Sequence, residues 1–96
     1  MRGNHEHSLK EALEQLVKTY RMEGKLNEVK LISSWARMMG PMIAHRTGDI
    51  YIRDRKLYVK LTSAPLREEL NNARPKIVSM LNAEAGAEVI EEIVFQ

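Results

Sequence analysis

The sequence predicts an α+β fold in which a small mixed three-stranded sheet is covered on one face by helices. Three observations predict this class. Apolar residues recur at helical spacing in the first part of the chain, residues 50–62 alternate apolar and polar side chains, and residues 89–95 form a β-branched segment after further helical patterns. The chain has 96 residues, enough for one domain. We therefore expect a disordered tail over residues 1–7 and a single domain over residues 8–96.

The first predicted helix begins at a capping box. The Ser8 hydroxyl and the Glu11 carboxylate can each accept a hydrogen bond from an otherwise unpaired backbone N–H of the first turn. Gly24 predicts the end of this helix one or two residues earlier, because glycine readily adopts the conformation that closes a helix. The apolar face has helical spacing and consists of Leu9, Leu13, Leu16, Val17 and Tyr20.

A second helix is predicted over residues 27–39, and it carries the only tryptophan, Trp35. One indole buries more apolar area than any other side chain in this sequence, so we expect Trp35 to anchor the core. Gly40 and Pro41 then end the helix and open a short helical segment over residues 41–46. The predicted apolar stripe of the second helix is Val29, Ile32, Trp35, Ala36 and Met39.

A β-hairpin is predicted next. Residues 50–53 and 56–62 both alternate with a period of two, and Asp54 and Arg55 lie between them as a tight turn. Strands joined in this way are antiparallel. The side chains expected to face the helices are Ile50, Ile52, Leu57, Val59 and Leu61.

Two prolines organise the last third of the chain. Pro65 and Pro75 each suit the first turn of a helix, where the missing N–H costs nothing. Thr62 or Ser63 can cap the first of these helices. The final strand, residues 89–95, follows a helical crossover and can therefore lie parallel to one hairpin strand, which would make the sheet mixed.

The outward side of the hairpin combines aromatic and basic side chains. Such a surface can stack bases and neutralise phosphates, so we predict a nucleic-acid-binding face. Its residues are Tyr51, Arg53, Arg55, Lys56, Tyr58 and Lys60, with Arg55 in the adjoining turn. The alternative is a solvated strand face on which Tyr51 and Tyr58 form only a cross-strand pair. Either Glu91 or Glu92 must share this face and lower its positive potential.

A second basic group consists of Arg67, Arg74 and Lys76. We predict that these residues contact a protein partner, because charges at the rim of an interface steer association. The alternative is that they only keep a helix face soluble. No residue next to His45 in the sequence completes a recognisable catalytic motif with it. We therefore expect His45 only to cap the end of a helix.

Composition narrows the possible functions. The chain has no cysteine, which excludes disulfides and thiolate metal sites and favours a reducing compartment. Its apolar runs fall far short of the ~20 residues that span a bilayer, so we expect a cytoplasmic protein that does not bind membranes. The net charge of +2 permits contact with nucleic acid without requiring it. Without a phosphate loop, HExxH or GxSxG motif, the sequence predicts a non-enzymatic protein with no cofactor, metal or small-molecule substrate.

Several short motifs follow one another in a distinctive order. They are Trp35, Gly40-Pro41, Ile43-Ala44, His45-Arg46-Thr47, Leu57-Tyr58-Val59-Lys60-Leu61, Thr62-Ser63-Ala64-Pro65-Leu66 and Glu69-Leu70. In this order and spacing the chain resembles the DciA family over roughly residues 8–95. The resemblance implies a K-homology-like fold and a role in loading or operating the replicative helicase of bacteria, DnaB, with affinity for single- or double-stranded DNA. The GxxG loop of RNA-binding K-homology domains has no counterpart in this sequence.

Three functional hypotheses follow. The first is an adaptor in DNA replication that binds the replicative helicase and DNA. The second is a K-homology-like module that binds RNA, and the third is a domain that binds only proteins. Binding to single-stranded DNA, double-stranded DNA and RNA, measured across salt concentrations, separates these hypotheses.

Overall fold

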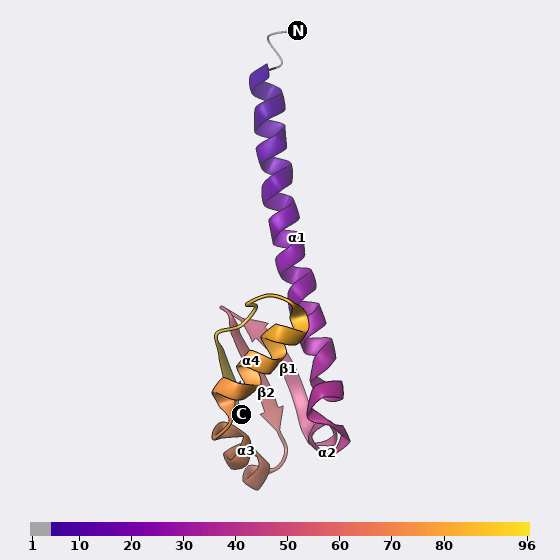
Figure 1. The fold of residues 1–96 in the computed structure, drawn as a ribbon, viewed down its shortest axis with the longest axis vertical. Helices are drawn as coiled ribbons and strands as arrows, with labels where there is room; N and C mark the ends of the chain where they lie inside the picture. Colours follow the sequence, from indigo (N-terminus) through magenta and orange to yellow (C-terminus); the bar gives the residue numbers. More distant parts are fainter. Residues whose placement is uncertain (1–4) are drawn as a thin grey trace.

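The computed structural model describes residues 5–96, with side chains from Ser8 onward. In chain order, the elements are α1 (His5–Met39), α2 (Pro41–His45), β1 (Thr47–Arg53), β2 (Lys56–Leu61), α3 (Ala64–Asn71), α4 (Arg74–Ala85) and β3 (Glu92–Phe95). The strand order is β1-β2-β3, with β1 and β2 antiparallel and β2 and β3 parallel (Figure 1). The predicted α+β class with a mixed three-stranded sheet is therefore confirmed, and the topology is compatible with the K-homology-like expectation.

The prediction of two helices separated at Gly24 is wrong, because α1 continues without a break from His5 to Met39. Gly24 has no positive φ, and a Cβ built there would meet nothing within 4 Å. A helical glycine costs only about 1 kcal/mol relative to alanine, and the good helix formers around it override that cost. The predicted start at Ser8 is also wrong. Of the tail expected at residues 1–7, the last three residues lie in α1, and residues 1–4 lie outside the described part of the chain.

The N-terminal half of α1 projects from the rest of the molecule as an arm, which we define as residues 8–26 (Figure 1). Every side chain of the arm is exposed, and the molecule measures 67 × 21 × 19 Å along its principal axes. The apolar face predicted for the first helix therefore lies outside the core. Its leucines are 51–63% exposed, and Tyr20 is 66% exposed.

The C-terminal half of α1 packs on α4 and the sheet through a face that only partly matches the predicted stripe: Trp35 is in the core and Ile32 and Met39 pack against it, as expected. Leu31, Ser34 and Trp35 are buried, and Met38 is half-buried, at the spacing i, i+3, i+4 and i+7. In contrast, Val29 is 59% exposed, and Ala36 is exposed as well. This part of the helix has apolar residues on more than one side, so its spacing alone did not decide which side meets the sheet.

The hairpin forms in the predicted register. Tyr51 lies opposite Tyr58, and both turn residues have positive φ, 50° at Asp54 and 61° at Arg55. Positive φ at both central residues is typical of a type I′ turn, whose twist matches that of the flanking strands. The inward-facing side chains are confirmed: Leu57, Val59 and Leu61 are buried, whereas Ile50 and Ile52 on the edge strand β1 are partly buried.

The predicted helix starts after the hairpin are also confirmed. The Ser63 hydroxyl accepts a hydrogen bond from the backbone N–H of Leu66, and a proline lies in the first turn of both α3 and α4. The last strand begins at Glu92, three residues later than predicted, because Asn82 holds the preceding loop in another conformation. The side-chain oxygen of Asn82 accepts hydrogen bonds from the backbone N–H groups of Val89 and Ile90, and its side-chain nitrogen donates to the carbonyl of Ile90.

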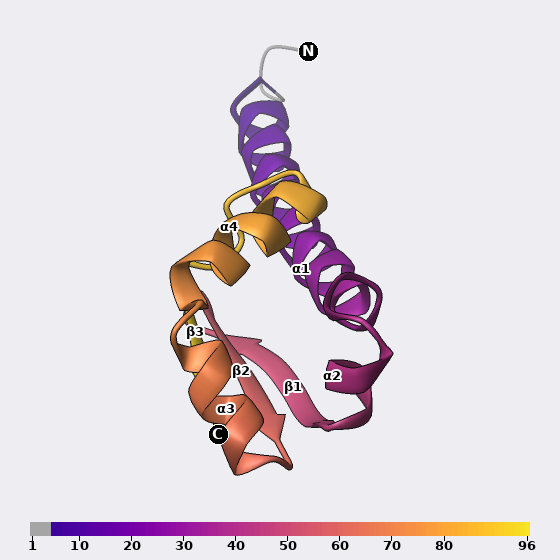
Figure 2. The ribbon, with the colours of Figure 1, turned by 60° about the horizontal axis from the view of Figure 1, so that its bottom comes forward.

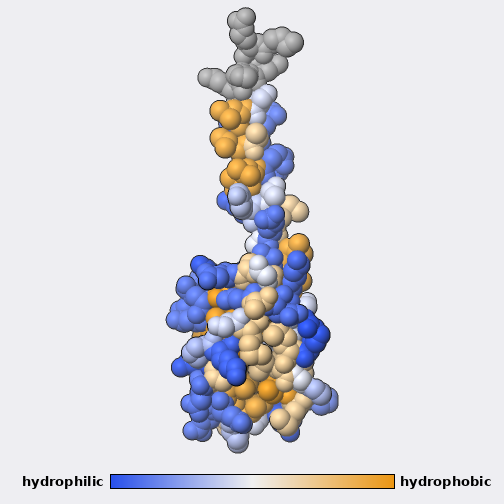
Figure 3. Space-filling model, viewed as in Figure 1, coloured by the Kyte–Doolittle hydropathy of each residue, from blue (hydrophilic) through white to orange (hydrophobic). Residues whose placement is uncertain are grey.

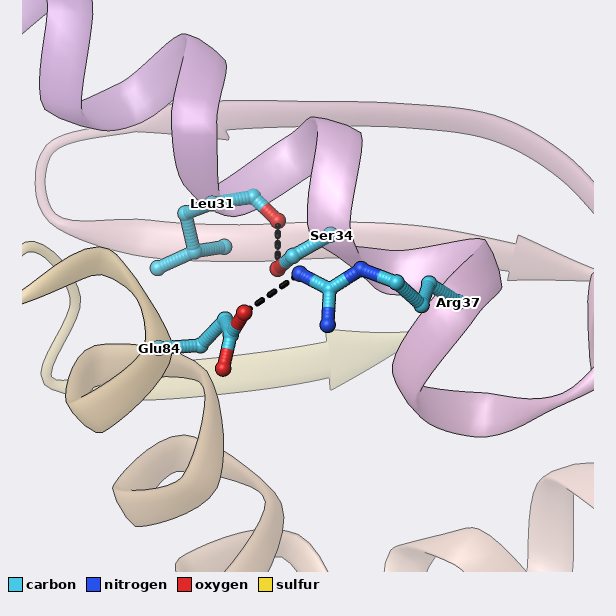
Figure 4. A network of polar contacts seen from close by, with 4 residues as sticks. All are labelled: Leu31, Ser34, Arg37 and Glu84. Carbon is cyan, nitrogen blue, oxygen red and sulfur yellow. Dashed lines mark hydrogen bonds and ion pairs between the residues drawn. The ribbon is translucent and has the colours of Figure 1, made fainter.

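The core lies between the sheet and the helices α1, α3 and α4, and the C-terminal end of α4 comes close to α1 (Figure 2). Trp35 and Phe95 meet there, with ring centroids 6.2 Å apart. Arg37 on α1 forms an ion pair with Glu84 on α4 across the same junction (Figure 4). In the adjacent turn, the Ser34 hydroxyl donates to the Leu31 carbonyl at 2.7 Å, so this buried polar group is satisfied. The Trp35–Phe95 contact and the Arg37–Glu84 ion pair join α1 to β3 and α4, and so help to hold the direction in which the arm leaves the domain.

Candidate nucleic-acid and partner surfaces

The sheet carries two stacked tyrosines on the side away from α1 and α4. The rings of Tyr51 and Tyr58 have centroids 5.0 Å apart and an interplanar angle of 12°. The predicted cross-strand pair is thus present, but stacking between the two rings uses only one face of each. Tyr51 is 42% exposed and lies on the edge strand, so its ring remains accessible to a planar ligand such as a base.

Three cations accompany the tyrosines. Arg53 lies directly opposite Lys56, and Lys60 extends from the same side of β2. The Nζ of Lys56 lies 3.7 Å from the Oε2 of Glu92 on β3, which confirms that one glutamate shares this side of the sheet. Positive charge still exceeds negative charge among these residues. We call this surface the outer sheet face, and it consists of Tyr51, Arg53, Lys56, Tyr58 and Lys60.

Arg55 is separated from the outer sheet face. Its guanidinium donates to the backbone carbonyl of Glu88 at 3.1 Å, in the loop that leads to β3. It also lines a small recess with Gly24 and Asn27 at the base of the arm. In this position Arg55 stabilises the loop that precedes β3. Its part in nucleic-acid binding remains a prediction.

The structure divides the second basic group. Arg67 is half-buried, and its guanidinium donates to the Leu61 carbonyl at 3.2 Å. Arg74 and Lys76 are exposed in the first turn of α4. Arg67 therefore has a structural contact within the domain, whereas the other two charges are free to meet a partner.

The arm is a candidate surface that the sequence did not reveal. Figure 3 shows apolar side chains gathered along one side of it. A second exposed apolar patch, formed by Met22, Leu26 and Val29, lies where the arm meets the domain. Helical spacing identified the apolar residues of the first helix correctly but implied that they are buried. One signal could have indicated that this apolar face is exposed: the inner side of three short strands is too small to cover every apolar helix face in this chain.

Residues 8–96 hold no cluster of three or more His, Cys, Asp or Glu side chains placed to bind a metal ion. No described helix combines the length and apolarity needed to cross a bilayer. The candidate surfaces described above are the outer sheet face, the exposed basic residues of α4 and the arm.

Comparison with known proteins gives one match. The model of the family described as "Dna[CI] antecedent, DciA" matches residues 8–95, nearly the whole chain. The matched range includes both the arm and the outer sheet face. No curated protein and no solved structure matches the chain significantly.

Proposed function

The chain belongs to the DciA family, and we propose that it is a non-enzymatic adaptor that binds both the replicative helicase and DNA. Membership of this family gives the chain a replication role of the helicase-loader type. The observation that carries the proposal is the extent of the match, because the family pattern begins at residue 8 and thus includes the projecting arm. The cytoplasm is the expected location for such a protein.

We assign the helicase contact to the arm. An amphipathic helix that lays its apolar side into a groove of another protein is a common mode of recognition. Leu9, Leu13 and Leu16 supply that side, and they are already held in a helix, so little conformational entropy is lost when they bind. The exposed charges of Arg74 and Lys76 would steer the approach of the helicase.

We assign DNA binding to the outer sheet face. The exposed ring of Tyr51 is available for stacking, and the cations around it can contact phosphates. The small net charge implies weak binding at physiological salt. A simultaneous helicase contact would compensate, because tethering raises the effective concentration of the second site.

The helicase contact is tested by mixing the purified chain and helicase in a calorimeter at two salt concentrations. The Leu13→Glu variant should weaken binding at least tenfold, because it places a carboxylate in the apolar contact. Gln15→Glu is the matched control: it adds the same charge at an exposed position outside the apolar side of the arm and should bind normally. Neither variant should shift the melting temperature. Absence of heat and of co-elution at tens of micromolar would contradict the helicase proposal.

The DNA contact is tested by measuring affinity for single-stranded DNA, double-stranded DNA and RNA over a range of salt concentrations. Tyr51→Ala should cost ~1–3 kcal/mol with little change in the salt dependence, whereas Lys60→Ala should lower the salt slope by ~1. Lys30→Ala, which removes an exposed charge on α1, serves as the control. If both sheet variants bind as well as the native chain, DNA contacts another surface. A clear preference for RNA would favour the alternative of an RNA-binding module.

A further inference from the structure

The free edge of β3 lines a cavity of about 490 Å³. One wall is residues 91–94, and the other is the end of α3 and the first turns of α4. Side chains of a strand alternate between its two sides, so consecutive residues line one cavity only where it runs along the edge of the strand. We call this cavity the β3 groove. Its helical wall consists of Asn71, Arg74, Pro75 and Val78.

The backbone of β3 presents unpaired groups to this groove. The N–H of Gln96 donates to the Val59 carbonyl, and its carbonyl accepts from the Leu61 N–H, both at 2.8 Å. Gln96 therefore points its backbone groups toward β2. Because these groups alternate along a strand, those of Ile93 and Phe95 point toward the open edge, where another extended chain can pair with them.

The walls of the groove favour a peptide over a nucleic acid. Val78 and Val94 are half-buried and offer an apolar surface beside the strand edge. The groove is lined by the Glu91 carboxylate, by the Arg74 guanidinium and by Glu92, whose carboxylate is already paired with Lys56. Among the described residues, Glu91 forms no ion pair, and its charge would repel a phosphate backbone but attract a basic side chain.

We propose that the β3 groove binds an extended peptide, which adds a fourth strand to the sheet by pairing with β3. The peptide places an apolar side chain against Val78 and a lysine or arginine beside Glu91. Backbone hydrogen bonds along an exposed sheet edge provide affinity, and the side-chain pockets provide specificity. This site lies apart from the arm, and its existence does not depend on the proposed binding of helicase and DNA.

The test begins with a library of random linear nine-residue peptides displayed on phage and selected against the complete chain. The best peptide is synthesised with a fluorophore, and its affinity is measured by anisotropy. N-methylation of the peptide, one residue at a time, should weaken binding about tenfold at alternate positions and leave the positions between them unaffected, because only alternate N–H groups face β3. Uniform sensitivity, or a period near 3.6, overturns the proposal.

Two charge reversals locate the site. Glu91→Lys should weaken binding of the selected peptide about tenfold, because it places like charges side by side. Replacing the basic residue of the peptide by glutamate should restore binding to this variant. Glu88→Lys is the matched control, since Glu88 is an exposed glutamate that lines a different recess, and it should bind as the native chain does.

Three outcomes overturn the proposal. The first is a selection in which every enriched peptide binds the Glu91→Lys and native chains equally well. The second is displacement of the peptide by a single-stranded DNA oligonucleotide with matching shifts of the Ile93 and Phe95 amide resonances, which would assign the groove to nucleic acid. The third is loss of peptide binding in Leu13→Glu, which would place the peptide on the arm.

Discussion

At the scale of single residues, Trp35 joins the core to the start of the sheet. Its side chain is 3% exposed, packs against Phe95 and donates from Nε1 to the Thr47 hydroxyl at 3.0 Å. The Thr47 hydroxyl in turn donates to the Ile43 carbonyl at 2.8 Å. One side chain thus fixes α1, α2 and β1 relative to one another.

Two substitutions of Trp35 separate the stability that comes from its packing from the stability that comes from its hydrogen bond. Trp35→Ala should lower the free energy of unfolding by ~3–5 kcal/mol, because it leaves a large cavity in a small core. Trp35→Phe keeps most of the volume and should cost about 1–2 kcal/mol, of which about 1 is the hydrogen bond to Thr47. Chemical denaturation of the two variants measures the difference. Equal losses, or a shift of only a degree or two for alanine, would falsify this assignment.

At the scale of elements, α1 is continuous only if Gly24 keeps its helical conformation. Since Gly24 is helical and a Cβ there has free space, Gly24→Ala should stabilise the helix by about 1 kcal/mol and raise the helical circular dichroism signal. Gly86 provides the contrast, because it ends α4 with a φ of 78°. Gly86→Ala should cost ~1–2 kcal/mol, since a Cβ is strained in the left-handed region. A lower helical signal for Gly24→Ala would show that the helix breaks at this residue.

At the scale of the whole molecule, the arm dominates the shape. The Cα radius of gyration is 18.4 Å, whereas a compact domain of this length has roughly 13 Å. Small-angle X-ray scattering should therefore give a value near 18 Å at low concentration. A value near that of a compact domain would mean that the arm folds back at Gly24. A value that rises with concentration would mean that the apolar side of the arm pairs with a second copy.

Features that depend only on neighbouring residues could be predicted from the sequence. The period of two in residues 50–62 set the hairpin and both of its faces, since a one-residue slip would turn every apolar side chain to the solvent. Ser63, Pro65 and Pro75 marked helix starts because capping and the fixed φ of proline act locally. The order of elements then implied a mixed sheet, and short motifs with Trp35 among them indicated the family that the comparison confirmed.

Whether a given side chain is buried or exposed depended on contacts that form only in the folded molecule. Leu9 and Leu31 both belong to apolar faces of α1, yet one is 63% exposed and the other fully buried, because α4 and the sheet cover only the C-terminal half of the helix. The sequence records that a side chain is apolar but not whether a partner surface lies within reach. In the same way, only the fold turned Arg55 toward the Glu88 carbonyl and left β3 with an open edge beside α4. Contacts between residues distant in sequence carry no periodic signal, so they emerge only when the whole chain is folded.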